Sequence, residues 1–243
     1  MSFWDHLDVL RGTLFRSVLA ILLVAVVFMC IPTQLFKAVL WPTTQDFILY
    51  RWLGLSFQMS LINIDVSAQF FVHLKISVLM ALIIAFPYVV YEIWRFVAPA
   101  LYDNEKKAVR KAFRLSSFLF YAGVAVGYFI VLPVCLMFFM NYTVSDAVQN
   151  TISLNSYVSL FTSMVFLIGL LFEFPTVVLV LSNIGLLTRK QLKGFRKQAF
   201  VVILILAAFI TPSDPFSMFV LSIPLYGLYE FSILMCKPDD SNQ

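Results

Sequence analysis

The sequence predicts an all-α membrane protein with six transmembrane helices, on the basis of its composition, its apolar stretches and the placement of its charges. Of the 243 residues, 61% are hydrophobic and 12% are charged, and the mean hydropathy is +0.92. Soluble domains carry about 25% charged residues. Apolar stretches of roughly 18 residues or more, long enough to cross a hydrocarbon core of about 30 Å, recur along the whole chain. A single polytopic membrane domain over residues 1–243 is therefore expected.

Hydrophobic windows divide this domain into its spans. The predicted spans lie at about 15–37, 69–91, 113–141, 157–184, 198–211 and 216–236. The stretch before the first span holds acids and lacks a small-residue cleavage motif, which favours a retained helix over a signal peptide. The fifth span has only twelve uninterrupted apolar residues, Ala199 to Ile210, which is about 18 Å of helix. It should form a short hairpin with the sixth around "TPSDP".

Prolines interrupt four of the predicted spans. Pro87 lies in the second, Pro133 in the third, Pro175 in the fourth and Pro224 in the sixth. Each proline removes a backbone hydrogen bond and is expected to kink its helix. Four kinks in six short helices indicate a curved, open wall rather than a straight bundle.

The basic residues are strongly sorted between the two sides of the membrane. Fourteen of the seventeen Lys and Arg residues lie on the side that holds both chain ends. Only Lys37 and Arg51 lie in the opposite loops, and Lys75 lies within a span. The positive-inside rule therefore places both termini in the cytoplasm. The placement of the charges is therefore more informative than the net charge of +4. No nucleic-acid partner is expected.

No metal, cofactor or catalytic site is predicted. The two histidines, His6 and His73, lie in different segments without Cys or paired acids at ligand spacing. Cys30, Cys135 and Cys236 lie in apolar segments and form no CxxC pair, so they are interpreted as packing residues. The motifs of serine hydrolases, zinc proteases and P-loop proteins are absent from the sequence. The sequence therefore does not predict an enzyme.

Four ionisable residues lie within or beside the spans. Glu173 is the deepest, since about sixteen residues precede it in its span and about eleven follow. It must be protonated, paired or facing a water-filled cavity, and we favour a functional role over an internal hydrogen bond. Snorkelling toward the interface accounts for Lys75 and for Asp214 in the outer hairpin turn. For Glu230, near the end of the last span, function and snorkelling are left open.

The first inner loop, "YEIWRFVAPALYDNEKKAVRKAFR", contains acids among many basic residues. Glu92, Asp103 and Glu105 are either ordinary solvated charges or, near Pro99 and Tyr102, rigidly held acids. A rigidly held carboxylate could accept a bidentate hydrogen bond from an arginine. The residues alone leave these two interpretations open.

Several motifs appear in a characteristic order over nearly the whole chain. They are "HLDVLR", "FFVHLKIS", "IWRFVAPALYDNEKK", "LFYAGVAVGYFIVLPV", "FEFPTVVLVL", "FITPSDPFS" and "IPLYGLYE". In these motifs the chain closely resembles the TatC family of twin-arginine translocase subunits, membrane receptors that export folded proteins. The resemblance implies a glove-like wall of six helices in the bacterial cytoplasmic membrane. It also implies a cytoplasmic surface that binds the twin-arginine motif of signal peptides.

The resemblance assigns roles to individual residues. Glu105 matches the acid of the "APALYxxE" motif and is expected to accept an arginine guanidinium. Glu173 matches the intramembrane acid of the family, which is linked to partner helices. Asp214 matches the acid of the "TPxD" turn near the place where partner helices associate. The expected signal-peptide site comprises Asp5, Asp8, Arg11, Tyr102, Asp103 and Glu105, and the expected intramembrane polar or partner positions are Lys75, Glu173, Asp214 and Glu230.

One position departs from the family pattern. The N-terminal motif resembles HLxELR, whereas "HLDVLR" has Val9 at the position of the glutamate. Asp8 is adjacent but about 100° around a helix, and Asp5 would share the face of Val9 if the segment is helical that far. Either Asp5 or Asp8 replaces the glutamate, which we favour, or the recognition site is altered and weaker.

Three functional hypotheses follow from the sequence. The first is a non-enzymatic receptor that binds twin-arginine signal peptides, associates with itself and with single-span TatA/TatB-type subunits, and depends on the proton-motive force. The second is a proton-coupled small-solute transporter that uses Glu173 as the carrier, but the inverted repeats typical of such proteins are not evident. The third is a scaffold that only organises neighbouring helices.

Overall fold

The computed structural model describes residues 3–54, 59–97, 103–143, 145, 150–211 and 214–236, without the side chains of 3–6, 103–109 and 111. Almost all of the described chain is helical. The elements in chain order are α1 Phe3–Met29, α2 Pro32–Leu40, the 3-10 turn η1 Trp41–Thr43, α3 Ile48–Leu53, β1 Leu61–Ile62, α4 Ala68–Val97, α5 Asp103–Val126, the π-helical turn η3 Gly127–Val131, α6 Leu132–Asn141, β2 Ile152–Ser153, α7 Leu154–Leu171, α8 Phe174–Asn183, α9 Arg189–Gly194, α10 Arg196–Ile210 and α11 Pro215–Met235.

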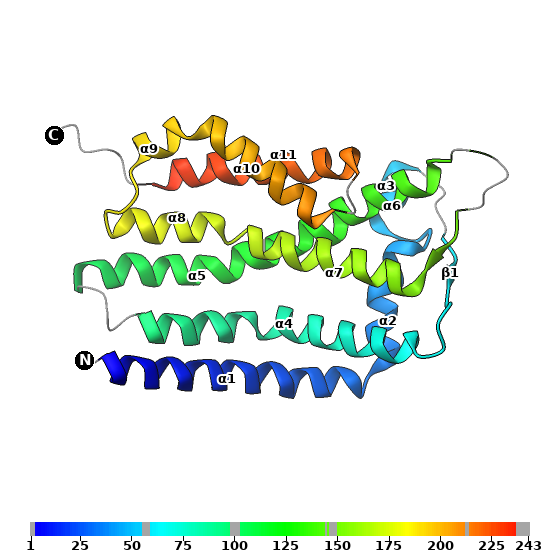
Figure 1. The fold of residues 1–243 in the computed structure, drawn as a ribbon, viewed down its shortest axis with the longest axis horizontal. Helices are drawn as coiled ribbons and strands as arrows, with labels where there is room; N and C mark the ends of the chain where they lie inside the picture. Colours follow the sequence, from blue (N-terminus) through cyan, green and yellow to red (C-terminus); the bar gives the residue numbers. More distant parts are fainter. Residues whose placement is uncertain are drawn as a thin grey trace.

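The long helices lie side by side along the longest axis of the molecule (Figure 1). From one edge to the other they run α1, α4, α5, then α7 with α8, and finally α10 with α11 (Figure 1). We call the end where α1 and α5 begin and α11 ends the terminal end, and α9 also lies there. The opposite end, with α2, α3 and the two strands, is the distal end (Figure 1).

The prediction of an all-α membrane protein is confirmed. Five helical segments of the described chain are long and apolar enough to cross a membrane: Leu7–Met29, Ala68–Val97, Ala112–Asn141, Leu154–Asn183 and Pro215–Met235. The remaining long helix, α10, has 15 residues, which is about 22 Å at 1.5 Å per residue. The hairpin of α10 and α11 is therefore short, as the sequence indicated.

Helix boundaries differ from the predicted spans at two places. The first span was predicted to continue to residue 37, but α1 ends at Met29 and Pro32 opens a separate helix, α2. Proline is favoured in the first turn of a helix, where its missing N–H is not needed. The fourth span, 157–184, is divided into α7 and α8 by a break at Phe172 and Glu173. The positions of the membrane surfaces along these helices stay predictions.

Two of the four prolines at which kinks were predicted lie next to irregular backbone. Pro175 lies in the first turn of α8, directly after the break at Glu173. Pro133 follows the π-helical turn η3, where the chain bends between α5 and α6 (Figure 1). Pro87 and Pro224 lie inside the continuous helices α4 and α11. Wide turns next to proline are a common cause of helix bending.

Three glycines allow α5, η3 and α7 to pack backbone against backbone. A Cβ atom added to Gly123 would lie 2.6 Å from a ring carbon of Phe172 and 2.9 Å from the Cα of Gly169. A Cβ atom added to Gly127 would lie 2.9 Å from the carbonyl oxygen of Met164. Gly123 and Gly127 form a GxxxG pattern, which permits close approach of membrane helices. This contact holds α5 and η3 against the C-terminal half of α7.

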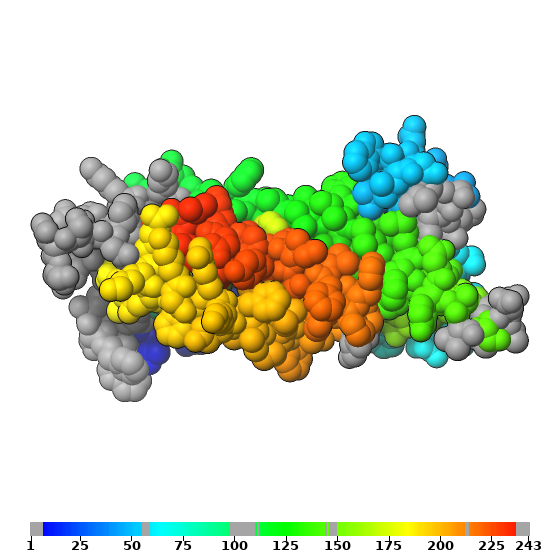
Figure 2. Space-filling model, turned by 90° about the horizontal axis from the view of Figure 1, so that it is seen from above, coloured from blue at the N-terminus to red at the C-terminus, as the bar shows by residue number. Residues whose placement is uncertain are grey.

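The distal end is tied together by hydrogen bonds between segments far apart in the sequence. Strands β1 and β2 pair in parallel, with Leu61 opposite Ile152. The Tyr157 hydroxyl on α7 donates to the Val39 carbonyl at 2.6 Å. Burial raises the pKa of the Tyr50 phenol well above its usual range, so it stays a neutral donor to the Pro42 carbonyl, at 2.9 Å. Figure 2 shows the light-blue region around α3 projecting from this end.

Candidate functional site

The two segments that carry the predicted signal-peptide residues both lie at the terminal end (Figure 1). Helix α1 starts at Phe3, so positions 5 and 9 are one helical turn apart, which was the condition for Asp5 to replace the missing glutamate. Asp8 and Arg11 are exposed. Helix α5 begins at Asp103 and includes Glu105. Tyr102 and the side chains of Asp5, Asp103 and Glu105 lie outside the described part of the structure.

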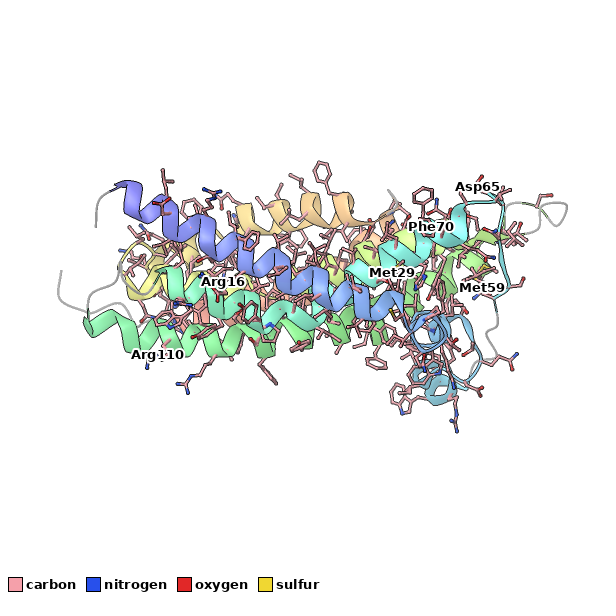
Figure 3. The ribbon with its side chains drawn as sticks, turned by 90° about the horizontal axis from the view of Figure 1, so that it is seen from below. Arg16, Met29, Met59, Asp65, Phe70 and Arg110 are labelled. Atoms are coloured by element: carbon pink, nitrogen blue, oxygen red, sulfur yellow. The ribbon has the colours of Figure 1, made fainter. Side chains whose placement is uncertain are left out.

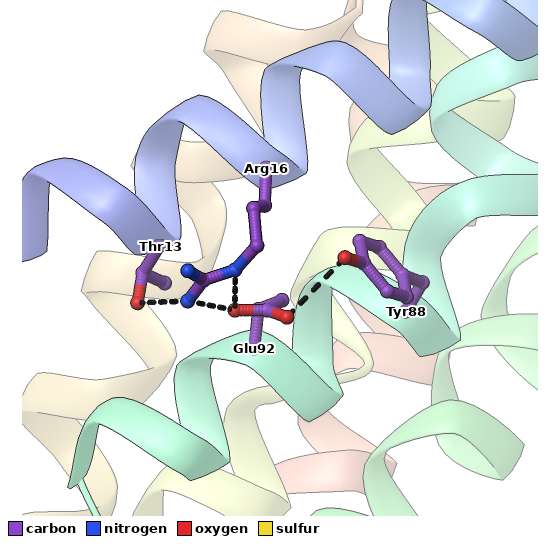
Figure 4. A network of polar contacts seen from close by, with 4 residues as sticks. All are labelled: Thr13, Arg16, Tyr88 and Glu92. Atoms are coloured by element: carbon purple, nitrogen blue, oxygen red, sulfur yellow. Dashed lines mark hydrogen bonds and ion pairs between the residues drawn. The ribbon is translucent and has the colours of Figure 1, made fainter. Parts of the chain in front are cut away.

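A partly buried polar network joins α1 to α4 close to this end (Figure 4). The Arg16 guanidinium donates to Glu92 Oε2 from Nε at 2.9 Å and from Nη2 at 2.7 Å. The Tyr88 hydroxyl donates to Glu92 Oε1 at 3.2 Å, and Arg16 also donates to Thr13 Oγ1 at 3.4 Å. The Glu92 side chain is only 2% exposed, whereas Arg16 is 39% exposed.

This network resolves the open interpretation of Glu92. It is neither a solvated charge nor a free acceptor, because both carboxylate oxygens are already bonded within the chain. A buried carboxylate requires such partners, since an unpaired buried charge is strongly unfavourable. The ion pair holds α1 in one register on α4. Sequence reasoning did not detect it because Arg16 and Glu92 are 76 residues apart.

Glu173 forms an internal hydrogen bond at the break between α7 and α8. The Ser116 hydroxyl on α5 donates to Glu173 Oε2 at 2.6 Å. The other oxygen, Oε1, is buried and has no hydrogen-bond partner among the described residues. The Thr176 side chain faces the same carboxylate without a hydrogen bond of standard geometry. Glu173 is therefore half satisfied, with one buried oxygen that lacks a hydrogen-bond donor among the described residues.

The partner of Glu173 also shows how deep the carboxylate lies. Ser116 is six residues after Arg110 on α5, which is about 9 Å along the helix. It is also the fifth residue of the apolar segment Ala112–Asn141. By this measure Glu173 lies closer to the terminal end than the residue count along its own span suggested.

The remaining intramembrane candidates are bonded within the chain. Glu230 on α11 accepts a hydrogen bond from Arg196 on α10 at 2.6 Å, and its other oxygen accepts one from Tyr226 at 3.3 Å. Lys75 donates to the Ser159 hydroxyl at 3.0 Å and is exposed. Asp214 caps the start of α11, because its Oδ2 accepts the Ser217 backbone N–H at 2.6 Å.

The described residues contain no group of three or more His, Cys, Asp or Glu side chains arranged to hold a metal ion. The His73 ring packs against Phe36 with ring centroids 5.7 Å apart. An apolar groove of about 310 Å³ lies between the α7–α8 break and the hairpin of α10 and α11. Its wall includes Leu171 and Phe174, which flank Glu173 in the sequence. Figure 2 shows this hairpin, yellow-orange to red, lying across one face of the molecule.

Comparison with known proteins accounts for this arrangement. Residues 5–224 match the protein family described as "Sec-independent protein translocase protein (TatC)". The chain belongs to the TatC family. A TatC protein of a Blattabacterium from Periplaneta americana is 36% identical over 249 residues, which cover 96% of this chain and 94% of that protein.

Solved TatC structures share the fold as well as the sequence. A crystal structure of the twin-arginine translocase receptor TatC superposes with a TM-score of 0.78 at 33% identity, covering 95% of this chain and 97% of that one. A second, of the receptor in the detergent DDM, gives a TM-score of 0.80 at 33% identity, with 96% and 99% coverage. This TatC chain is thus a multi-pass membrane protein of a translocase family, and the family resemblance stated from its motifs is confirmed.

Proposed function

We propose that this chain is the receptor subunit of a twin-arginine translocase, which binds twin-arginine signal peptides at its terminal end and assembles partner subunits for export of folded proteins. The observation that carries the proposal is that two acidic segments, the start of α1 and the start of α5, lie at the same end of the molecule, on either side of α4 (Figure 1). The guanidinium groups of two successive arginines bind well to carboxylates such as those these segments carry.

The distinction between satisfied and free acids supports this assignment. Glu92, Glu173 and Glu230 each accept a hydrogen bond from a neighbouring helix. Asp8 is exposed and forms no ion pair with any residue that the structure describes. Among the described acids at this end, Asp8 is therefore available to a guanidinium from outside, and we assign Asp5, Asp103 and Glu105 to the same site.

The orientation follows from the charge distribution. Arg11, Arg110 and Arg196 lie on elements at the terminal end, whereas Lys37 and Arg51 lie at the distal end. We place the terminal end in the cytoplasm of a bacterium, where signal peptides arrive. Membership of the TatC family implies that the proton-motive force drives export.

Partner assembly is assigned to the region around Glu173. The apolar groove beside it is bounded by helices that expose large apolar side chains, such as Phe174 at 41% and Val202 at 52%. A single-span TatA/TatB-type helix could pack its apolar side chains into this groove, beside the buried Glu173 carboxylate. A solute transporter with Glu173 as proton carrier is not favoured, because this carboxylate is bonded to Ser116 and the family is a protein translocase component.

Site-specific crosslinking tests the recognition site. Photoreactive groups at positions 5, 8, 9 and 105 are expected to crosslink a twin-arginine signal peptide and to lose the product when its paired arginines are replaced by lysines. A group at exposed position Trp52 on α3, at the distal end, serves as the negative control. Equal crosslinking of the lysine peptide, or no crosslinking from 8 and 105, would contradict the assignment.

A further inference from the structure

A pocket between α4 and α5 at the terminal end carries two arginines that the proposed receptor function does not use. Its volume is about 560 Å³. The residues that line it are Pro87, Val90, Tyr91 and Trp94 on α4 and Arg110, Phe113, Arg114 and Ser117 on α5. Figure 3 shows Arg110 near the terminal end, on the side of the molecule where α4 and α5 meet.

The pocket is positively charged and its charges are not neutralised within the described structure. Arg110 and Arg114 are one helical turn apart and therefore share a face of α5. Both are exposed, and neither forms an ion pair with a described residue. The nearest acid on the facing helix, Glu92, is bonded to Arg16 of α1 instead. The Arg110 guanidinium lies 5.9 Å from the ring centroid of Trp94, which orients it by a cation–π contact.

The floor and walls of the pocket are apolar and aromatic. Pro87, Val90 and Phe113 provide the apolar part, and the Trp94 ring packs against Phe113 with centroids 5.3 Å apart. Tyr91 is 57% exposed beside them. Tryptophan and tyrosine favour the level of the lipid headgroups, where one end of the ring is apolar and the other is hydrated. The pocket therefore combines a cationic rim with an apolar base.

The depth of the pocket matches that of a lipid phosphate. Arg110 and Arg114 stand on either side of Ala112, where the apolar membrane segment Ala112–Asn141 begins. A phosphodiester at this level would receive paired N–H groups from a guanidinium while its acyl chains continue along the apolar base. Basic pockets between membrane helices are known to hold anionic headgroups. The arginines of a signal peptide, by contrast, would be repelled here.

We propose that this pocket binds the phosphodiester headgroup of an anionic membrane phospholipid, with Arg110 and Arg114 as the anion-binding residues and Trp94 as the residue that orients Arg110. The bound lipid joins α4 to α5 at the terminal end. This inference does not depend on the proposed receptor function, because it concerns a different ligand and a different set of residues.

Native mass spectrometry of the full chain in detergent tests the proposal. Phosphatidylglycerol and phosphatidylcholine with identical acyl chains are added, and the retained lipid is counted. The unchanged chain is expected to retain phosphatidylglycerol preferentially, and Arg110→Gln with Arg114→Gln is expected to weaken that binding about tenfold. The matched control, Lys193→Gln with Lys197→Gln, removes the same charge from exposed positions at the same end, also four residues apart, and should leave binding unchanged.

Three results would overturn the proposal. They are equal retention of the two lipids by the unchanged chain, an equal loss of binding in the lysine control, and displacement of the lipid by soluble glycerol phosphate at the same concentration. The last would identify a site for free phosphate. Because the arginine variant could fail to fold, thermal unfolding of the unchanged chain is measured as well. Stabilisation by phosphatidylglycerol over phosphatidylcholine is expected, and its absence counts against the site.

Discussion

Acidic side chains in this protein differ in whether the fold already provides their hydrogen-bond partners. Glu92, Glu230 and Asp214 are each bonded within the chain, and their distances of 2.6 to 2.7 Å are typical of charge-assisted bonds. Glu173 is intermediate, with one oxygen bonded to Ser116 and the other free. Asp8 is exposed. Acids that are bonded within the fold are therefore distinguishable, residue by residue, from acids that are exposed.

Replacing Glu92 by methionine should lower the thermal stability of the chain, because it leaves the Arg16 guanidinium facing an apolar neighbour between α1 and α4. The double variant Arg16→Met with Glu92→Met should recover part of the loss, since no unpaired charge remains. Thermal unfolding in one detergent, followed by circular dichroism, measures both. If the double variant lost more stability than the two single variants together, the two residues would not form a mutual ion pair.

Replacing Val9 by glutamate should strengthen binding of a twin-arginine peptide to the extent that Asp5 and Asp8 do not fully replace the missing carboxylate. The position is exposed on α1, so the added ion pair is expected to contribute up to about 1 kcal/mol, or roughly fivefold in affinity. Val9→Gln has nearly the same shape without the charge and serves as the control. Unchanged affinity in Val9→Glu would indicate that Asp5 or Asp8 already supplies the missing carboxylate.

Replacing Glu173 by alanine should reduce export of a folded reporter several-fold, because it removes the polar group at the proposed partner site and leaves the Ser116 hydroxyl without its acceptor. Glu173→Gln keeps a hydrogen-bond acceptor and should retain more export. The two variants are compared at equal membrane abundance. Export at the full rate by the alanine variant would indicate that Glu173 has only a structural role, as the acceptor of the Ser116 hydrogen bond.

At the scale of the elements, the interruptions in the helices have local causes. The break between α7 and α8 places Glu173 just before the proline-initiated first turn of α8. The π-helical turn η3 starts at Gly127, one of the glycines at which α5 and η3 closely approach α7. Both irregularities lie along one contact line, where α5 packs on α7 and α8. That contact brings Ser116 to Glu173.

Replacing Gly123 by leucine should destabilise this contact. The added side chain would meet Phe172 and Gly169, and overpacking of this kind costs about 1–3 kcal/mol. A Cβ atom added to Gly227 in α11 would meet no neighbouring atom within 4 Å, so Gly227→Leu is a matched control in a membrane helix. Unfolding in denaturant compares the two. Equal stability of the two variants would show that the close approach of α5 and α7 is not required.

At the scale of the whole molecule, the two ends differ in chemistry. The terminal end gathers basic residues, both acidic segments and the arginine pocket, whereas the distal end contains short helices and a two-stranded sheet (Figure 3). The short hairpin of α10 and α11 makes the wall thinner on one side, where the bilayer should thin or partner helices should shield it.

Reporter fusions test the orientation of the molecule. A reporter that is active only in the cytoplasm should be active when fused after Cys236, and one active only outside should be active when inserted at residues 55–58. The reverse pattern would contradict the prediction that both termini are cytoplasmic. Insertion at Gly194, on α9 at the terminal end, provides a second cytoplasmic position.

Much of the fold and part of the site could be predicted from the sequence. Hydropathy and charge sorting are properties of contiguous segments. The sequence could therefore predict the membrane class and the short α10. It could also predict that Arg110, Arg114 and Arg196 lie at the same end. The family motifs indicated the acidic segments around Asp8 and Glu105. The division at Glu173 was missed because hydropathy does not register a break within an apolar run.

Only the tertiary structure decided which polar groups are paired. Arg16 and Glu92 are 76 residues apart, and Ser116 and Glu173 are 57 residues apart, so no local pattern joins them. Their pairing depends on which helices become neighbours and in which register. The sequence by itself determined that the chain lies in a membrane and which end is basic, since those properties are summed over neighbouring residues. The packing of distant helices decided which charges are satisfied internally and which stay free for a partner.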